Sequence, residues 1–133
     1  MEILLIEDDP LDAKLTNIIA KEIDPEINIV WYSDSEVLSN LLNGTQLNEI
    51  EPRLILLDIK LPKVDGLELL KKIMAHDILK QVPVVMFTSS ELHEDYSASM
   101  EHGALEYLVK PMQIDRFRSE LRRVILKYSN AHC

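Results

Sequence analysis

Cysteine is almost absent from this chain, since the only one is Cys133, the last of its 133 residues. A single cysteine cannot form an intramolecular disulfide or build a thiolate metal site. Long hydrophobic segments are missing too: apolar runs such as Leu54–Leu57 are far shorter than the about 20 residues of a membrane helix. The opening Met1-Glu2-Ile3 has no basic segment leading into an apolar one, which argues against a secretory signal.

Basic residues are scarce: 14 Lys and Arg stand against 23 Asp and Glu, for a formal net charge of −9. This balance argues against direct nucleic acid binding, which needs a basic face, and against docking on an anionic membrane. Apolar residues make up 47% of the chain, as in a globular domain. We expect one domain over residues 1–128, a frayed tail over 129–133, no output domain and a cytoplasmic location.

Five short apolar runs, rich in Ile, Val and Leu, recur at fairly regular spacing. They are too short for helices, and their lack of alternation suits strands buried on both faces of a parallel sheet. Segments of helical period separate them, and Ile114 to Tyr128 is a clear amphipathic example. The alternation predicts an α/β fold, a doubly wound five-stranded parallel sheet. The runs are Ile3–Ile6, Ile27–Trp31, Leu54–Leu57, Val82–Phe87 and Leu105–Val109.

Polar residues interrupt two of the runs, with Asn28 in the second and Glu106 in the fifth. Interrupted strands suit sheet edges, which favours the flavodoxin-like strand order 2-1-3-4-5. In that order the crossovers reverse between strands 1 and 3, and ligands bind there, beyond the carboxyl ends of the strands. The stretch Ser33–Glu36 is interpreted as a capping box for the second helix, and residues 43–52 as a polar connection.

Polar side chains follow four of the runs at the point where each ends. Because the carboxyl ends of parallel strands meet at one edge, we expect these side chains to converge. Two carboxylates about 4 Å apart repel by roughly 4 kcal/mol near a protein surface. Mg²⁺ or a lysine would offset that repulsion. The residues are Glu7, Asp8 and Asp9 after the first run, Asp58 after the third, Thr88, Ser89 and Ser90 after the fourth, and Lys110 after the fifth.

Each of these residues also has a simpler interpretation. Asp9 precedes Pro10, so it is expected to be the N-cap of the first helix rather than a metal ligand. Taken alone, Asp58 fits a turn aspartate. Thr88 or Ser89 fits a cap of the following helix, and Lys110 fits a surface charge. It is the conjunction of these residues at strand ends that indicates a functional site.

With these motifs in order, the chain resembles the receiver domains of two-component response regulators over residues 3 to about 127. The spacings agree as well: 50 residues from Asp8 to Asp58, 30 from Asp58 to Thr88 and 22 from Thr88 to Lys110. The matching stretches are Ile3–Asp9, Leu56–Pro62, Asp65-Gly66, Thr88-Ser89, Gly103-Ala104 and Lys110-Pro111.

The resemblance implies a phosphorylation switch. Asp58 would accept a phosphoryl group from a sensor histidine kinase or a histidine phosphotransfer protein. Mg²⁺, or Mn²⁺ in its place, would bind Asp8, Asp58 and the backbone carbonyl of Lys60, with Glu7 acting through water. Lys110 would pair with Asp58 and then with the phosphoryl oxygens.

The resemblance also implies how the signal would leave the site. Thr88 would hydrogen-bond a phosphoryl oxygen, and Tyr107 would follow the moving loop inward, although an exposed aromatic on an edge strand is the simpler interpretation of Tyr107. The changed surface would cover the fourth helix, fifth strand and fifth helix, roughly Glu91–Tyr128. Lys60 and Ser90 would tune the lifetime of the acyl phosphate, with no direction predicted.

Without an output domain, the chain would bind an unknown downstream protein, relay the phosphoryl group or act as a sink for it. It would not be an enzyme beyond Mg²⁺-assisted self-phosphorylation and self-dephosphorylation. The stretch Leu57–Gly66 resembles that of stand-alone receivers paired with phytochrome-like kinases. Because those proteins often self-associate, a homodimer through the surface of the fourth helix, fifth strand and fifth helix is a further hypothesis.

Three other functions stay open at this point. An aspartyl-nucleophile phosphatase also forms a phosphoaspartate after a strand, but it usually has a second acid two residues later, where this chain has Lys60. A flavodoxin-type cofactor carrier needs a first loop that cradles phosphate, and the acids from Glu7 to Asp9 would repel it. The complete set of motif residues argues against a receiver that serves as an unphosphorylated scaffold.

Overall fold

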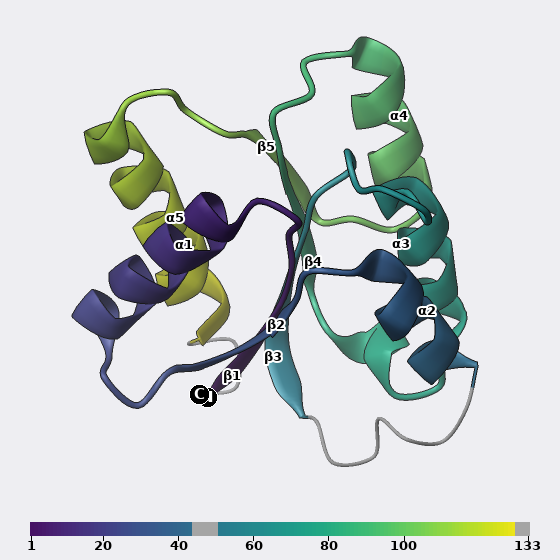
Figure 1. Cartoon of the computed structure of the whole chain (residues 1–133), viewed down its shortest axis with the longest axis horizontal. Coiled ribbons are helices and arrows are strands. Elements are labelled where there is room, and N and C mark those ends of the chain that lie inside the picture. Colours follow the sequence, from purple (N-terminus) through teal and green to yellow (C-terminus); the bar gives the residue numbers. More distant parts are fainter. Residues whose placement is uncertain (44–50, 130–133) are drawn as a thin grey trace.

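The computed structural model describes residues 1–43 and 51–129, so most of the polar connection and residues 130–133 of the tail lie outside it (Figure 1). Ser129, predicted to belong to the frayed tail, is the last residue of α5. The elements are β1 (Glu2–Ile6), α1 (Pro10–Ile23), β2 (Asn28–Tyr32), α2 (Ser35–Leu42), β3 (Pro52–Leu57), α3 (Gly66–Ala75), the 3₁₀ turn η2 (Leu79–Gln81), β4 (Val84–Thr88), α4 (His93–Glu101), β5 (Glu106–Val109) and α5 (Ile114–Ser129).

The five strands form one parallel sheet in the order β2-β1-β3-β4-β5, which confirms the predicted fold class and strand order. The register brings the carboxyl ends of neighbouring strands level with one another. Ile6, the last residue of β1, lies opposite Leu57, the last residue of β3. Thr88, at the end of β4, lies opposite Val109, at the end of β5. The residues that follow these strands therefore start from one edge of the sheet.

Helices cover both faces of the sheet, with α1 and α5 on one side and α2, α3 and α4 on the other (Figure 1). Successive strand residues point to opposite faces, so Leu4 packs in the core beneath α2 and α3 while Leu5 packs beneath α1 and α5. Burial of each such side chain contributes about 1.5–3 kcal/mol. This two-sided packing explains why the central runs show no polar alternation.

Aspartate side chains cap the first two helices. Asp9 Oδ1 accepts a hydrogen bond from the Leu11 N–H at 2.9 Å, which confirms its predicted role as the N-cap of α1. The capping box predicted at Ser33 is wrong by one residue, because α2 begins at Ser35 and Asp34 Oδ1 accepts from the Glu36 N–H at 2.9 Å. Within the described ranges, no helix is long and apolar enough to span a membrane.

Candidate functional site

Three acids meet at the carboxyl ends of β1 and β3. One carboxylate oxygen from each of Glu7, Asp8 and Asp58 lies within 4.8 Å of the other two. The pairing of β1 with β3 sets this arrangement, because the Asp58 N–H donates to the Ile6 carbonyl at 3.2 Å. Glu7 and Asp58 are buried, whereas Asp8 is exposed. Clustered carboxylate oxygens are the ligands that a hard divalent cation such as Mg²⁺ prefers.

Lys110, which follows β5, reaches into this acidic cluster. Its ammonium group donates to Oε1 of Glu7, to Asp58 Oδ2 at 3.0 Å and to Asp12 Oδ2 at 3.0 Å. The Lys110 side chain is only 10% exposed. The backbone N–H of Lys110 donates to the Thr88 carbonyl at 2.7 Å, which ties the end of β5 to the end of β4. The structure thus brings together Lys110 and the predicted acids from two other strand ends.

The site carries more negative than positive charge. Burial raises the pKa of Glu7 to about 7, against the lowering effect of Lys110, and the charge of Asp58 raises it further. Burial alone would lower the pKa of Lys110, but its contacts with Glu7, Asp58 and Asp12 outweigh burial and raise it above the usual lysine value. Lys110 therefore stays charged at neutral pH. A divalent cation would neutralise much of the remaining negative charge.

The loop after Asp58 approaches the site closely. Asp58 Oδ1 accepts a hydrogen bond from the Lys60 N–H at 3.2 Å, and the Lys60 side chain is exposed. The chain then returns at Gly66, whose N–H donates to the Ile59 carbonyl at 3.0 Å. A Cβ on Gly66 would overlap the Asp58 carbonyl oxygen and lie 2.7 Å from Ile59 Cα. Only glycine fits this approach, so Gly66 fixes the path of the backbone around Asp58.

Thr88 and Tyr107 each form a hydrogen bond with Ser90. Thr88 is fully buried, and its Oγ1 accepts from the Ser90 N–H at 3.3 Å. The Tyr107 hydroxyl donates to the Ser90 carbonyl at 3.0 Å, and burial raises the pKa of Tyr107. Tyr107 is half-buried, so it is not the exposed edge aromatic of the simpler interpretation. Thr88 does not cap α4 either, because Leu92 is the N-cap of that helix and makes no side-chain capping bond.

Three contacts at the site involve residues that sequence reasoning missed. Asp12 on α1 contacts Lys110, as described above. The Trp31 indole N–H donates to the Glu7 carbonyl at 2.7 Å. Ser90 Oγ donates to Asp95 Oδ2 on α4 at 2.5 Å. Trp31 lies opposite Leu5 in the neighbouring strand, so its place beside the end of β1 follows once the strand order is known.

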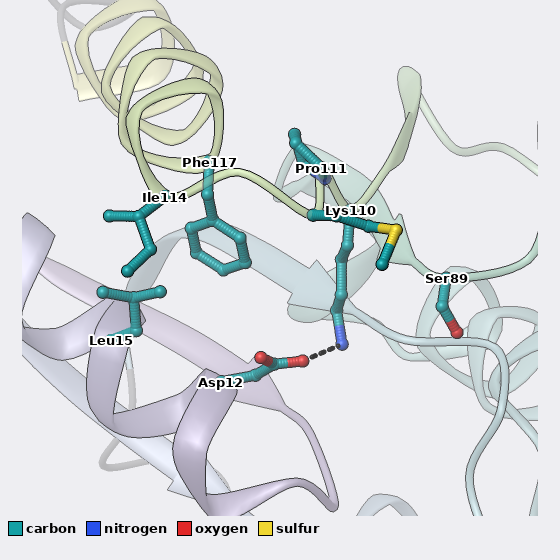
Figure 2. Close-up of a pocket in the computed structure, with 8 residues that line it drawn as sticks. Asp12, Leu15, Ser89, Lys110, Pro111, Ile114 and Phe117 are labelled. Atoms are coloured by element: carbon teal, nitrogen blue, oxygen red, sulfur yellow. Dashed lines mark hydrogen bonds and ion pairs between the residues drawn. The ribbon is translucent and has the colours of Figure 1, made fainter.

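A cavity of about 370 Å³ opens beside Lys110, between α1 and the loop from β5 to α5 (Figure 2). Leu15 and Ile114 point toward one another across its apolar side, near Phe117. Asp12 and Lys110, joined by their ion pair, lie on its polar side. Lys110 therefore connects the wall of this cavity to the acidic cluster.

Clustered acids, a lysine and a buried threonine at the carboxyl edge of a parallel α/β sheet suit the binding of a divalent cation and a phosphoryl group. The family model for the response regulator receiver domain matches residues 3–122. The chain belongs to this family, which confirms the resemblance drawn from its motifs. It is thus a receiver domain of phosphorylation-based two-component signalling and not a classical enzyme.

Curated proteins and solved structures of the same family resemble this chain over most of its length. The response regulator Rcp1 of Synechocystis is 38% identical over 110 residues, 81% of this chain and 75% of Rcp1. The chemotaxis protein CheY of Listeria monocytogenes is 35% identical over 100 residues, 72% of this chain and 82% of CheY. The phosphorylated cyanobacterial phytochrome response regulator RcpA superposes with a TM-score of 0.88 at 27% identity, covering 97% of this chain and 94% of RcpA. The Mn²⁺-bound form of Rcp1 gives a TM-score of 0.87 at 30% identity, covering 98% and 95%.

Proposed function

We propose that the protein is a phosphorylation switch in which Asp58 accepts a phosphoryl group from a sensor histidine kinase or a histidine phosphotransfer protein. The observation that carries this proposal is the position of Asp58, buried between other acids with its Oδ2 3.0 Å from the Lys110 ammonium. Phosphoryl transfer depends on positioning and on neutralising charge around the phosphoryl oxygens, and this geometry favours both.

The acidic cluster fits a divalent cation. Asp8, Asp58 and the Lys60 carbonyl would bind Mg²⁺ directly, or Mn²⁺ in its place, and Glu7 would act through water. The Mn²⁺-bound structure of the relative Rcp1 supports a cation in a protein of this kind. When bound, the cation would neutralise charge on the phosphoryl oxygens.

The chain's own residues supply the remaining steps. A carboxylate oxygen of Asp58 forms a bond to phosphorus, the bond from phosphorus to the donor atom breaks, and the electron pair leaves with the donor. Lys110, already 3.0 Å from Asp58 Oδ2, would then pair with a phosphoryl oxygen. The Thr88 Oγ1 accepts from the Ser90 N–H, so the Thr88 hydroxyl hydrogen can be donated to another phosphoryl oxygen.

The surroundings of the site suit a protein as the donor of the phosphoryl group. Two apolar side chains that line the Lys110 cavity are exposed, Met112 fully and Ile114 to 58%. Leu11, which precedes Asp12 in the chain, is 76% exposed. Exposed apolar side chains that lie together are typical of surfaces that bind other proteins. A histidine kinase or a histidine phosphotransfer protein would present its phosphorylated histidine to this surface.

Ser90 links the site to the proposed output surface. Its N–H, carbonyl and hydroxyl contact Thr88, Tyr107 and Asp95, so movement of Thr88 toward a phosphoryl oxygen would displace both α4 and β5. We infer that phosphorylation changes the surface of α4, β5 and α5, where an unknown downstream protein would bind. Lys60 and Ser90, beside the acyl phosphate, would tune its lifetime.

A homodimer through the same surface stays a hypothesis. Exposed Leu92, Tyr96, Leu105 and Val109 lie on α4, on β5 or beside them and would supply apolar contact area. We expect the dimer to form, or to strengthen, when a phosphoryl mimic is bound. Sedimentation equilibrium with and without the mimic measures the mass, and a monomer in both conditions would end the hypothesis.

Phosphorylation itself is tested by incubating the protein with Mg²⁺ and acetyl phosphate. We expect intact mass spectrometry to show a single phosphoryl adduct that is stable in acid and labile in base, as an acyl phosphate should be. Chelation of Mg²⁺ should prevent its formation. Absence of the adduct would contradict the proposal, and many turnovers of a generic aryl phosphate would favour the phosphatase alternative instead.

A further inference from the structure

Asp12 differs from the other carboxylates that contact Lys110. Glu7 and Asp58 are buried members of the proposed metal site, whereas the Asp12 side chain projects from the first turn of α1 and is 30% exposed. Its Oδ2 lies 3.0 Å from the Lys110 ammonium, on the wall of the cavity shown in Figure 2. Asp12 lies outside the sequence motifs that resemble those of receiver domains.

All N–H donors of the Lys110 ammonium group are already in use. A lysine ammonium carries three N–H donors, and the three contacts with Glu7, Asp12 and Asp58 use all of them. The contact with Asp58 can pass to the phosphoryl group that Asp58 itself carries, but any further phosphoryl oxygen competes with Glu7 and Asp12 for the ammonium group. Release of Glu7 would leave a buried carboxyl group without its partner, whereas Asp12 at the rim can turn to water at lower cost. Asp12 is therefore the partner that Lys110 gives up.

Charge repulsion also favours the separation of Asp12 from Lys110 in the phosphorylated state. A phosphoryl group adds a charge of about −2 beside Lys110, and the carboxylate of Asp12 would both repel that group and compete for the same ammonium. We propose that Asp12 is a positioning residue that holds Lys110 in the unphosphorylated state and opposes its transfer to the phosphoryl oxygens. This inference rests on the proposed function of Asp58. Asp12 thereby limits the stability of the phosphorylated state.

The test measures the affinity of the protein for beryllofluoride, a phosphoryl mimic, at saturating Mg²⁺. Bound mimic is detected directly by ¹⁹F NMR. We expect Asp12→Asn to bind the mimic about tenfold more tightly than wild type, the scale of one charge-assisted hydrogen bond. A purely structural role for Asp12 would leave the affinity unchanged or weaken it, because loss of a structural contact does not tighten binding.

Two further variants separate the hold of Asp12 on Lys110, here called the tether, from other effects of the substitution. Asp115→Asn removes the same charge from the first turn of α5, where the side chain is 99% exposed, and should bind the mimic as wild type does. Asp12→Glu keeps the charge on α1 and should bind the mimic with an affinity within about twofold of wild type. Thermal unfolding of each variant confirms that the fold is retained.

The outcomes decide between this inference and the proposed function. If wild type binds no mimic, the phosphoryl-accepting role of Asp58 fails, and the tether fails with it. If wild type binds but Asp12→Asn shows equal or weaker affinity, the tether alone is overturned. Equal tightening in Asp115→Asn, or tightening in Asp12→Glu, would likewise overturn it, since general charge or altered packing would then explain the effect.

Discussion

Replacing Asp58 by asparagine should abolish the adduct formed with acetyl phosphate while leaving the fold intact. The amide lacks the carboxylate oxygen that attacks phosphorus, so no acyl phosphate can form. The volume of the side chain is unchanged, and Lys110 keeps its contacts with Glu7 and Asp12. The lost pair with Lys110 is offset because the charge of Asp58 also repels Glu7. We therefore expect the free energy of unfolding to change by less than about 1 kcal/mol.

A matched control for this variant lies next to the site. Asp9→Asn makes the same chemical change in the acidic segment Glu7–Asp9 that follows β1, and asparagine caps a helix as well as aspartate does. Intact mass spectrometry should show a normal adduct for Asp9→Asn and none for Asp58→Asn, with similar thermal unfolding. Asp8→Asn should reduce labelling severely, through the cation. Full labelling of Asp58→Asn would place the phosphoryl group elsewhere and remove the basis of the proposal.

The strand order was predictable because the polar interruptions mark real edges of the sheet. Asn28 is exposed on β2, one edge strand. On the other edge, Glu106 accepts hydrogen bonds from Arg123 at 3.0 Å, Lys127 at 3.1 Å and Tyr128 at 2.6 Å, all on α5. These contacts outweigh burial and lower the pKa of Glu106. Sequence periodicity predicted the edge but not these partners, because they depend on how α5 packs over β5.

Three of the site residues predicted from the sequence share one geometric property. Glu7, Asp58 and Lys110 each follow a strand directly, so the parallel topology alone brings them to one edge. Asp12 lies instead on a helix, and Trp31 reaches back to the end of a neighbouring strand. The directions of such side chains are set by the packing of α1 and β2 and by side-chain rotamers, which a linear pattern does not contain.

The error at Ser33 has a similar origin. Ser33 and Glu36 have the spacing of a capping box, and the residues themselves allow it. In the structure, Asp34 caps α2 and also pairs with Lys63 at 3.0 Å, while Ser35 Oγ donates to the Pro62 carbonyl at 2.8 Å. Contacts with the loop that follows β3 thus place the start of the helix one residue later. Tertiary contacts decided between two local alternatives.

Replacing Gly66 by alanine should cause the largest loss of stability among these variants. The new methyl group would overlap the Asp58 carbonyl oxygen and lie 2.8 Å from the Asp58 carbonyl carbon. Both are backbone atoms, so no side-chain rotation can relieve the contact. Either α3 moves away from the sheet or the backbone of Asp58 is displaced. We expect a loss of about 3 kcal/mol in the free energy of unfolding, at the upper end for overpacking.

The same displacement should reduce phosphorylation, because a misplacement of about 1 Å at a reacting group can lower a rate about a hundredfold. Urea unfolding measures stability, and the rate of adduct formation with acetyl phosphate measures the site. Glu68→Ala, an exposed change in the same first turn of α3, should alter both only slightly. Near-wild-type behaviour of Gly66→Ala would mean that the loop after Asp58 absorbs the methyl group, and that Gly66 does not position the phosphoryl acceptor.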